Sequence, residues 1–493
     1  MRQRVKAPLA SLATSTLVLA ISAPTYGQEK VTTPPATPAK ASAGPLNDWL
    51  RGECAAFNRW DIGGQFRARV EFKNNGGSDG KYANEDFMKA PPGGKIDDNA
   101  FLFLREKLHV GYTPCAWMGF YAEGRDGSST SDQRHPNPGA DEYDLHQANI
   151  VLGNLKQFPL VAKMGRQELM YGDERMVGVA DWGNLGRSFE AAKLRYENTQ
   201  VWVDAFVGRV VMPANHEFNQ PNEHGLLTGV YASTETLIPV QETQAYFLSH
   251  NVGDESTPAA NPAWIASPSK PQDTRTIGLR LKSLPGKLGA WDYTAEVAGQ
   301  FGRITGKRGG ATTRLDQEAF TLSLTGGYTW KHTIWSPRLS LGYDFASGDG
   351  DPNDGRSGTF EPIFPTNHRS YGYMDLTGPR NIHDPRVGVA LKPAKGLAVS
   401  LDYHLFVLAD TQDYFYPESG SGRGTNGYGL HPGYSNFVGS ELDLDATYAI
   451  KPWFVVRAGY GHFFVGDYIT RSLAAAGGAQ DADWLYVQTV VSF

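Results

Sequence analysis

Apolar and polar residues alternate with a period of two over many short segments of this chain. From 61 to 72 the even positions hold apolar residues or glycine, whereas most odd positions are charged or polar. The same alternation recurs at 277–282, 338–345, 441–448 and 454–461. A period of two predicts β-strands with one face toward apolar surroundings and the other toward water.

Candidate strands occur along almost the whole chain. We expect about eighteen, an even number as in bacterial single-chain barrels, starting near residues 61, 101, 116, 143, 159, 188, 200, 226, 240, 274, 290, 317, 335, 385, 396, 438, 452 and 482. Between them we expect long, turn-rich connections at 73–100, 126–143, 208–225, 302–316, 347–384, 409–437 and 466–483. The pattern predicts an all-β protein, a transmembrane antiparallel β-barrel with long extracellular loops and short periplasmic turns.

The N-terminal residues have the layout of a secretory signal. Three basic residues precede a mostly apolar stretch from 7 to 23, and the small residue Gly27 follows. We therefore expect a signal peptide at 1–27 and a disordered periplasmic leader at 28–56, where proline and threonine are frequent. The barrel domain is expected at 57–493.

The overall composition agrees with a barrel. The mean hydropathy is −0.40, and no later stretch reaches the roughly 18 apolar residues of a spanning helix, which excludes a helical membrane protein. Only alternate residues of a barrel strand meet lipid, so a barrel is compatible with this value. The net charge of −6 argues against nucleic acid as a partner.

The chain ends in a strand-like segment with a terminal aromatic residue. Apolar residues alternate from 484 onward up to Phe493. This ending resembles the C-terminal signal of bacterial outer-membrane barrels. It implies recognition by the barrel-assembly machinery and a place among the lipids of the outer membrane of a Gram-negative-type bacterium.

The chain has two cysteines, and both fall on the expected periplasmic side. Cys54 precedes the first strand, and Cys115 lies in a predicted periplasmic turn. The periplasm is oxidising. We therefore predict a disulfide between Cys54 and Cys115.

Three sequence blocks resemble the alginate-export family of outer-membrane porins: 164–175 with 181–182 and 186–191, then 343–349, and 439–444. The resemblance runs from about Asp61 to Phe493. It implies a monomeric barrel of about eighteen strands, with an arginine-lined constriction that passes an anionic polysaccharide or related anions. By motif, Arg166 and Glu168 match the family's Gly-Arg-Gln strand, whose arginine faces the pore. Many members share these blocks without a role in alginate secretion, so the fold carries over better than the substrate.

The water-facing positions of the expected strands carry many cations. Besides Arg166 and Glu168, the expected pore-lining and substrate-binding residues are Arg67, Arg69, Arg105, Lys107, Lys163, Lys193, Arg195, Arg280, Arg338, Arg386 and Arg457. The strand near 438 instead carries Glu441, Asp443 and Asp445 on that side. Walls of arginine and lysine select anions through charge-assisted hydrogen bonds. The alternative is that these charges pair into ladders that stiffen the barrel.

We expect no metal and no cofactor. The segment 349–355 has alternating oxygens like a calcium loop but lacks the glycine and glutamate of that motif, so a turn-rich outer loop is the better interpretation. His109, His146, His404 and His462 fall on separate expected strands. The sequence favours a non-enzymatic channel for anionic carbohydrate, such as alginate-like polysaccharide or uronates, or other small anions, by passive diffusion. A general or sugar-uptake porin, a barrel-rim hydrolase and an adhesive barrel remain as alternatives.

Overall fold

The computed structural model consists mainly of β-strands. It describes residues 44–76, 86–89, 98–134, 137–253, 271–308, 311–418 and 420–493. Eighteen long strands follow one another along the chain: β1 (Trp60–Asn74), β2 (Asn99–Cys115), β3 (Met118–Thr130), β4 (Asp141–Gly153), β5 (Leu160–Gln167), β6 (Phe189–Glu197), β7 (Trp202–Met212), β9 (Gly225–Ile238), β10 (Gln241–Val252), β11 (Gln272–Ser283), β12 (Trp291–Arg308), β13 (Ala311–Thr329), β14 (Arg338–Ala346), β16 (Ile382–Ala394), β17 (Leu397–Leu408), β18 (Phe437–Lys451), β19 (Phe454–Val465) and β20 (Ala482–Ser492). Two further strands, β8 (Gln220–Pro221) and β15 (Arg356–Ser357), have two residues each.

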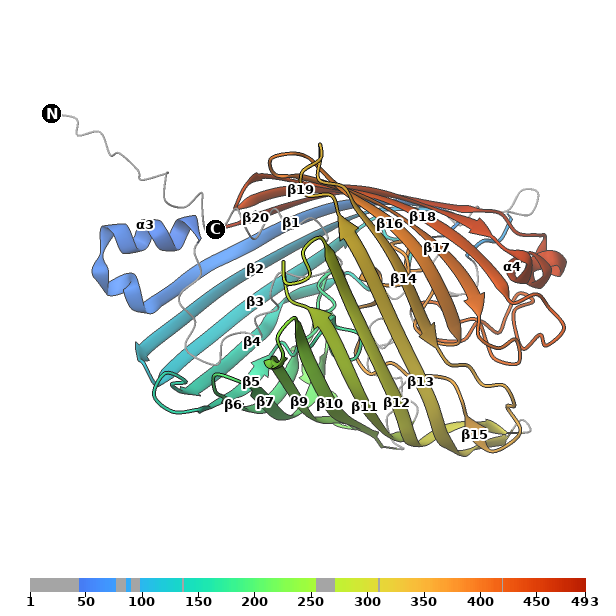
Figure 1. The fold of residues 1–493 in the computed structure, drawn as a ribbon, viewed down its shortest axis with the longest axis horizontal. Helices are drawn as coiled ribbons and strands as arrows, with labels where there is room; N and C mark the ends of the chain where they lie inside the picture. The colour runs from blue at the N-terminus through green and yellow to red at the C-terminus, as the bar shows by residue number, and fades with distance from the viewer. Residues whose placement is uncertain are drawn as a thin grey trace.

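The long strands form one closed antiparallel barrel. Each pairs with its neighbour along the chain, and β20 pairs with β1, where Arg67 lies opposite Val490. The terminal residue completes this seam, since the backbone N–H of Phe493 donates to the carbonyl oxygen of Gly64 at 2.9 Å. Figure 1 shows the strands running strongly tilted around the wall. The prediction of an antiparallel barrel of eighteen strands is confirmed.

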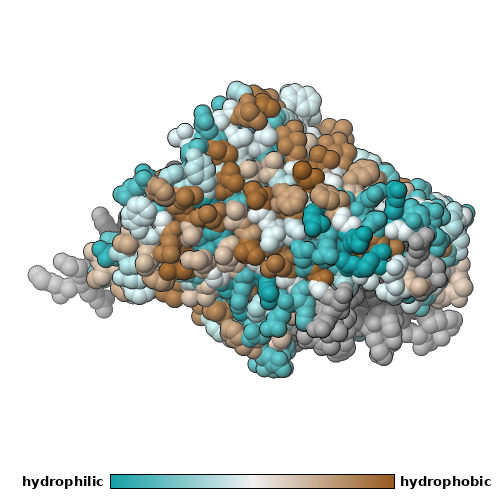
Figure 2. Space-filling view, turned by 90° about the horizontal axis from the view of Figure 1, so that it is seen from below, coloured by the Kyte–Doolittle hydropathy of each residue, from teal (hydrophilic) through white to brown (hydrophobic). Residues whose placement is uncertain are grey.

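The alternation of the sequence separates the two faces of the wall. Phe66 and Phe72 on β1 are exposed, whereas Arg67 and Arg69 between them are buried inside. Figure 2 shows hydrophobic side chains spread over a broad zone of one outer face, with hydrophilic ones gathered toward one end. Among the described residues, no helix is long and apolar enough to cross a membrane.

One expected long connection is a strand pair instead. Residues 302–308 and 311–316 continue β12 and β13, and Arg303 lies opposite Asp316. The glycines of this region suggested a loop. Ile304 and Leu315 are nevertheless buried, so the period of two extends through it.

A short helical hairpin precedes the barrel and corrects two expectations. Helix α3 (Pro45–Glu53) and the 3-10 helix η1 (Ala55–Arg59) lie beside the end of the barrel where the chain terminates (Figure 1). The expected disordered leader is therefore wrong for residues 45–53. The expected signal peptide, and the leader up to residue 43, lie outside the described residues.

The predicted disulfide is also wrong. Cys54 and Cys115 are both exposed free thiols. Cys54 lies at the junction between α3 and η1, two ordered elements that the leader was not expected to contain.

Two long connections fold against the inner wall and meet inside it. The β5–β6 loop (168–188) and the β14–β16 loop (347–381, with the 3-10 helix η2, Asn367–Arg369) join through a parallel bridge between Val177 and Phe364. Helix α4 (Asp467–Ser472) and the 3-10 helix η3 (Leu473–Ala476) belong to the β19–β20 connection. Their apolar side chains share one buried cluster that includes Leu169, Tyr171, Met176, Val177, Phe360, Ile363, Tyr371, Met374 and Tyr468, together with Phe415 of the β17–β18 connection. Much of the barrel interior is therefore filled by packed loops.

Candidate functional site

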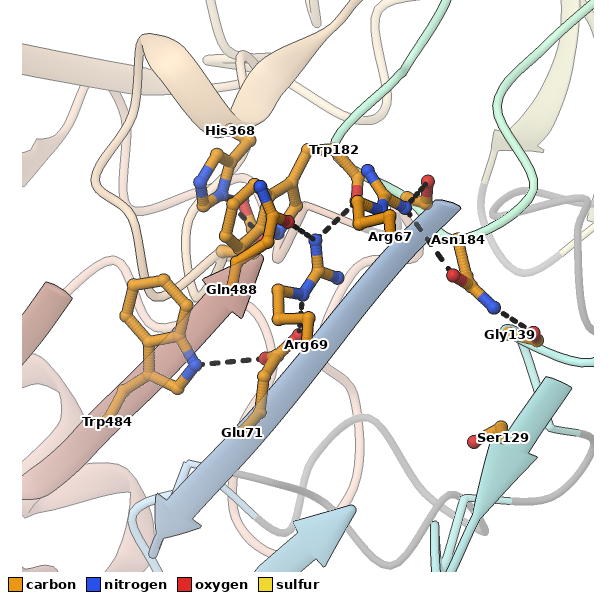
Figure 3. A network of polar contacts seen from close by, with 12 residues as sticks. Arg67, Arg69, Glu71, Ser129, Gly139, Trp182, Asn184, His368, Trp484 and Gln488 are labelled. Carbon is orange, nitrogen blue, oxygen red and sulfur yellow. Dashed lines mark hydrogen bonds and ion pairs between the residues drawn. The ribbon is translucent and has the colours of Figure 1, made fainter. Parts of the chain in front are cut away.

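Arginines from β1 and β2 form a basic patch on the inner wall. Arg67, Arg69 and Arg105 project inward because they occupy odd positions of strands whose even positions face outward, and all three are buried. The β5–β6 loop lies over them, as Figure 3 shows for Arg67 and Arg69. Arg67 donates to the carbonyl oxygens of Asp181 at 2.7 Å and Gly183 at 2.8 Å. Backbone oxygens of the loop thus occupy part of the patch.

One carboxylate of the loop, that of Asp181, also lies among these cations. Its Oδ1 atom accepts a hydrogen bond from Nη1 of Arg105 at 2.8 Å and lies 3.9 Å from Nζ of Lys107. The Asp181 side chain is 57 % exposed, whereas that of Arg105 is 2 % exposed, so the carboxylate meets water and the guanidinium does not. Desolvation raises the pKa of Asp181, but the charges of Arg105, Lys107 and Arg67 outweigh it and hold this pKa below its usual value.

The next loop residue, Trp182, is held by contacts to its ring and its backbone. The guanidinium carbon of Arg69 lies 3.8 Å from the centroid of the indole ring, and the imidazole of His368 stacks on it at 3.8 Å. Two planar groups at that distance cannot share one face, so both faces are covered. Arg69 also donates to the carbonyl oxygen of Trp182 at 2.7 Å (Figure 3). The Trp182 ring is therefore a fixed part of the wall.

Glu123, His146 and Glu168 lie close enough together to resemble a metal site. Their ligand atoms fall within 4.8 Å of one another. However, Nζ of Lys107 stands 3.7 Å from Glu123 and 3.6 Å from Glu168. Nδ1 of His146 faces Nη1 of Arg125, which can only donate, so Nε2 carries the hydrogen and donates to Glu168 at 3.0 Å. The arrangement fits an internal ammonium–carboxylate cluster better than a metal.

The cluster also keeps the first residue of the β5–β6 loop ionised. Desolvation raises the pKa of Glu168, but the Lys107 charge and the His146 hydrogen bond outweigh it and lower this pKa to about 2. The loop therefore begins with a carboxylate anchored to β2 and β4.

Further along the wall, most predicted cations are paired. Asp204 accepts from Arg195 at 2.6 and 2.9 Å and lies 3.4 Å from Lys193. Lys163 lies opposite Lys193 in the β5–β6 ladder. It is half-buried and, among the described residues, has no carboxylate within ion-pair distance. Nζ of Lys282 on β11 likewise has no hydrogen-bond partner in the described part of the chain.

Two more ion pairs fix the β5–β6 loop on the far side. Arg280 on β11 donates to both carboxylate oxygens of Asp173, at 3.0 and 2.8 Å. Arg175 lies 3.0 Å from Asp344 on β14. Asp344 also bonds Arg386 on β16. The loop is thus tied by charge to strands on several sides of the barrel.

The acidic strand β18 faces the β14–β16 loop and is sealed by it. Glu441 accepts from the backbone N–H of Met374 at 2.9 Å, and Asp443 accepts from that of Tyr373 at 3.1 Å. Their side chains are at most 1 % exposed. Two remaining predicted cations pair with acids close to them: Arg457 with Asp445 at 2.7 Å, and Arg338 with Asp292 at 2.9 and 2.5 Å.

Arg166 is on the other side of the wall from the pore, so the expectation carried by the family motif is wrong here. It stands directly opposite Glu190 in the ladder and donates to it at 2.8 Å. Its own face of β5 also carries the exposed Met164, whereas Lys163 occupies the inner face. The ring of Phe218, from the loop between β7 and β9, lies 5.1 Å from the guanidinium. Arg166 is therefore buried under an outer loop.

Sequence reasoning missed the loop residues that meet the cations. Asp173, Asp181 and Trp182 lie in a connection with no periodic pattern, where direction cannot be inferred. The one available signal was their place inside the family blocks at 164–175 and 181–182.

The fold and the sequence have counterparts among known proteins. The alginate export family model matches residues 59–480. OpdK of Pseudomonas aeruginosa, solved with vanillate, has a TM-score of 0.52 at 13 % identity, over 88 % of this chain and 98 % of that one. OccK2 (OpdF) of the same organism, in complex with glucuronate, gives the same values. No curated protein matches the sequence. The chain therefore belongs to the alginate export family, outer-membrane β-barrel proteins of Gram-negative-type bacteria.

Proposed function

We propose that this channel passes small anionic solutes of the sugar-acid class, uronates included, by passive diffusion. The carrying observation is an inner-wall cation without a carboxylate partner. Lys163 is half-buried on the inner face of β5, and no carboxylate of the described residues lies within ion-pair distance of it, whereas the acids Glu441 and Asp443 are sealed under the β14–β16 loop. An anion passing Lys163 therefore meets an ammonium charge that no ion pair neutralises.

The filled interior favours small solutes over a polymer. The β5–β6 and β14–β16 loops pack on each other through Val177 and Phe364 and carry much of the buried apolar cluster. A polysaccharide would need these loops to move apart. The two neighbours solved with vanillate and glucuronate support the same solute size and charge.

The remaining expectations are part of the same proposal. We assign the protein no enzymatic activity and a monomeric state. Phe493, whose backbone closes the seam with Gly64, is proposed to be recognised by the assembly machinery before that seam forms.

Reversal potentials in planar bilayers test the proposal. Under a potassium chloride gradient we expect preference for chloride, and added sodium glucuronate should reduce the current more strongly than an equal mass of polymeric alginate. Cation preference, or no response to glucuronate, would contradict it. Block by alginate alone would instead favour polymer transport.

One strand supplies a matched pair of variants. Lys163→Gln and Arg166→Gln remove one charge each from opposite faces of β5. An anion passing about 10 Å from a charge in water gains roughly 0.4 kcal/mol, so Lys163→Gln should lower the chloride-to-potassium permeability ratio about twofold. Arg166→Gln should leave it unchanged. Equal effects of the two variants would refute the assignment of Lys163 to the lumen.

A further inference from the structure

The β5–β6 loop places a carboxylate of its own where an anionic solute would bind. The Asp181 carboxylate is held by Nη1 of Arg105 at 2.8 Å and lies 3.9 Å from Nζ of Lys107. Arg67, directly behind, donates only to uncharged oxygens, those of Asp181, Gly183 and Asn184. Two cations thus contact the Asp181 carboxylate, and a third holds the backbone oxygen of the same residue.

The side chain of Asp181 can leave this position without undocking the loop. The backbone around it is held separately, because the carbonyl oxygens of 181, 182 and 183 accept from arginines of β1. Asn184 adds three hydrogen bonds, to the carbonyl oxygens of Leu104, Ser128 and Gly139. The Asp181 side chain is 57 % exposed, so a rotation of χ1 transfers it to water.

We propose that Arg105 and Lys107 form the docking site for a solute carboxylate, and that Asp181 is a built-in competitor which the solute displaces. This rests on the proposed function and identifies where in the lumen it acts. A solute carboxylate replaces one oxygen acceptor by another, so the buried guanidinium never loses its partner.

The neighbouring groups define what such a site recognises. Nη2 of Arg105 already donates to Gln65 at 2.7 Å, and Nζ of Lys107 also lies 3.7 Å from Glu123 and 3.6 Å from Glu168. A solute carboxylate therefore receives one guanidinium hydrogen bond and a share of the Lys107 charge. Both faces of the Trp182 ring are covered by Arg69 and His368, so it offers no platform for stacking a sugar. The site therefore recognises the negative charge of a solute and not the shape of its ring. Glucuronate and gluconate should bind alike, and glucose should not bind.

Removing the competitor tests the proposal. In single-channel recordings, Asp181→Asn should lower the half-blocking concentration of glucuronate about tenfold, the order expected when one charge-assisted hydrogen bond no longer competes. Asp181→Glu, which keeps the carboxylate, should stay within about twofold of the wild type. Adding Arg105→Gln to Asp181→Asn should abolish the gain.

Glu190→Gln is the matched control. It removes a carboxylate that also accepts from an arginine at 2.8 Å and is also partly exposed, but on the outer face. It should leave glucuronate block unchanged. An unchanged or higher half-blocking concentration in Asp181→Asn, in a channel that prefers anions and responds to glucuronate, would overturn the competitor while leaving the proposed function standing. Absence of anion preference and of block in every variant would overturn both.

Discussion

Replacing Arg280 by methionine should loosen the β5–β6 loop from the far wall. Arg280 is fully buried and donates to both oxygens of Asp173, at 3.0 and 2.8 Å, and to Gln244 at 3.1 Å. Methionine has a comparable apolar stem, so the variant removes the charge and its hydrogen bonds while leaving little new cavity.

The free-energy cost of losing this ion pair depends on how far Arg280 and Asp173 are exposed to water. Breaking a buried ion pair costs about 3–5 kcal/mol when the remaining charge stays buried. The Asp173 side chain is 28 % exposed and can regain water, so the cost falls to about 2–3 kcal/mol. That corresponds to a shift of roughly 30- to 150-fold in the equilibrium between the docked and undocked loop.

Hydrogen exchange of the loop amides measures this equilibrium directly. The N–H of Gly178 donates to Phe364, and that of Thr366 donates to Glu174, only while the two loops are docked. These amides should exchange faster in Arg280→Met by the same factor. Arg303→Met, which removes the exposed ion pair between Arg303 and Asp316, is the control. It should change the exchange rates of these amides by less than about threefold.

Exchange of Gly178 and Thr366 within about threefold of the wild type in Arg280→Met would refute the reasoning. It would mean that the contact between Val177 and Phe364, and not the ion pair, holds the loop.

Three further predictions concern pH, the thiols and the sealed acids. Desolvation raises the pKa of Asp375 to about 7, and desolvation with the charge of Asp375 raises that of Glu418 to about 7. Because these values exceed those of free carboxyls, the docked loops bind more protons than undocked ones, so docking should be strongest below pH ~4 and weaken as the pH rises to about 7. Open-channel noise should therefore be greater at pH 8 than at pH 5, and Asp375→Asn should reduce this difference. Cys54 and Cys115 should both react with a maleimide without prior reduction, and a mass shift for only one, or none, would contradict their free state. Glu441→Leu should remove the acceptor for the N–H of Met374 and leave that donor buried, at a cost of about 1–3 kcal/mol. The amides of residues 373 and 374 should then be less protected from hydrogen exchange. Unchanged protection would show that the loop needs no acid beneath it.

The alternation of residues was sufficient to predict the wall. A side chain's face on a strand depends only on its position within that strand, so the inner positions of Arg67, Arg69 and Arg105 could be assigned without tertiary information. The same rule places Lys163 and Arg166, three positions apart, on opposite faces. The family motif suggested that Arg166 faces the pore, and here the local rule was the better guide.

Local patterns failed where ordered structure had no clear periodicity or where glycines masked it. The glycines at 302–316 predict a loop where the structure has a strand pair, and the few apolar residues before 45 predict a leader where it has a helix over 45–53. The predicted disulfide depended on the same expected leader, whereas Cys54 is a free thiol between α3 and η1.

The sequence alone determined the number, order and faces of the strands, because each of these follows from residues a few positions apart. Only the tertiary structure decided what the inner cations meet. Arg67 finds Asp181 at a separation of 114 residues and Arg280 finds Asp173 at 107. Such pairs depend on which loops fold inward, and the inward loops are packed together through Val177, Phe364 and their neighbours. No periodicity along the chain records it, since loop residues are constrained by contacts in space and not by a repeating backbone geometry.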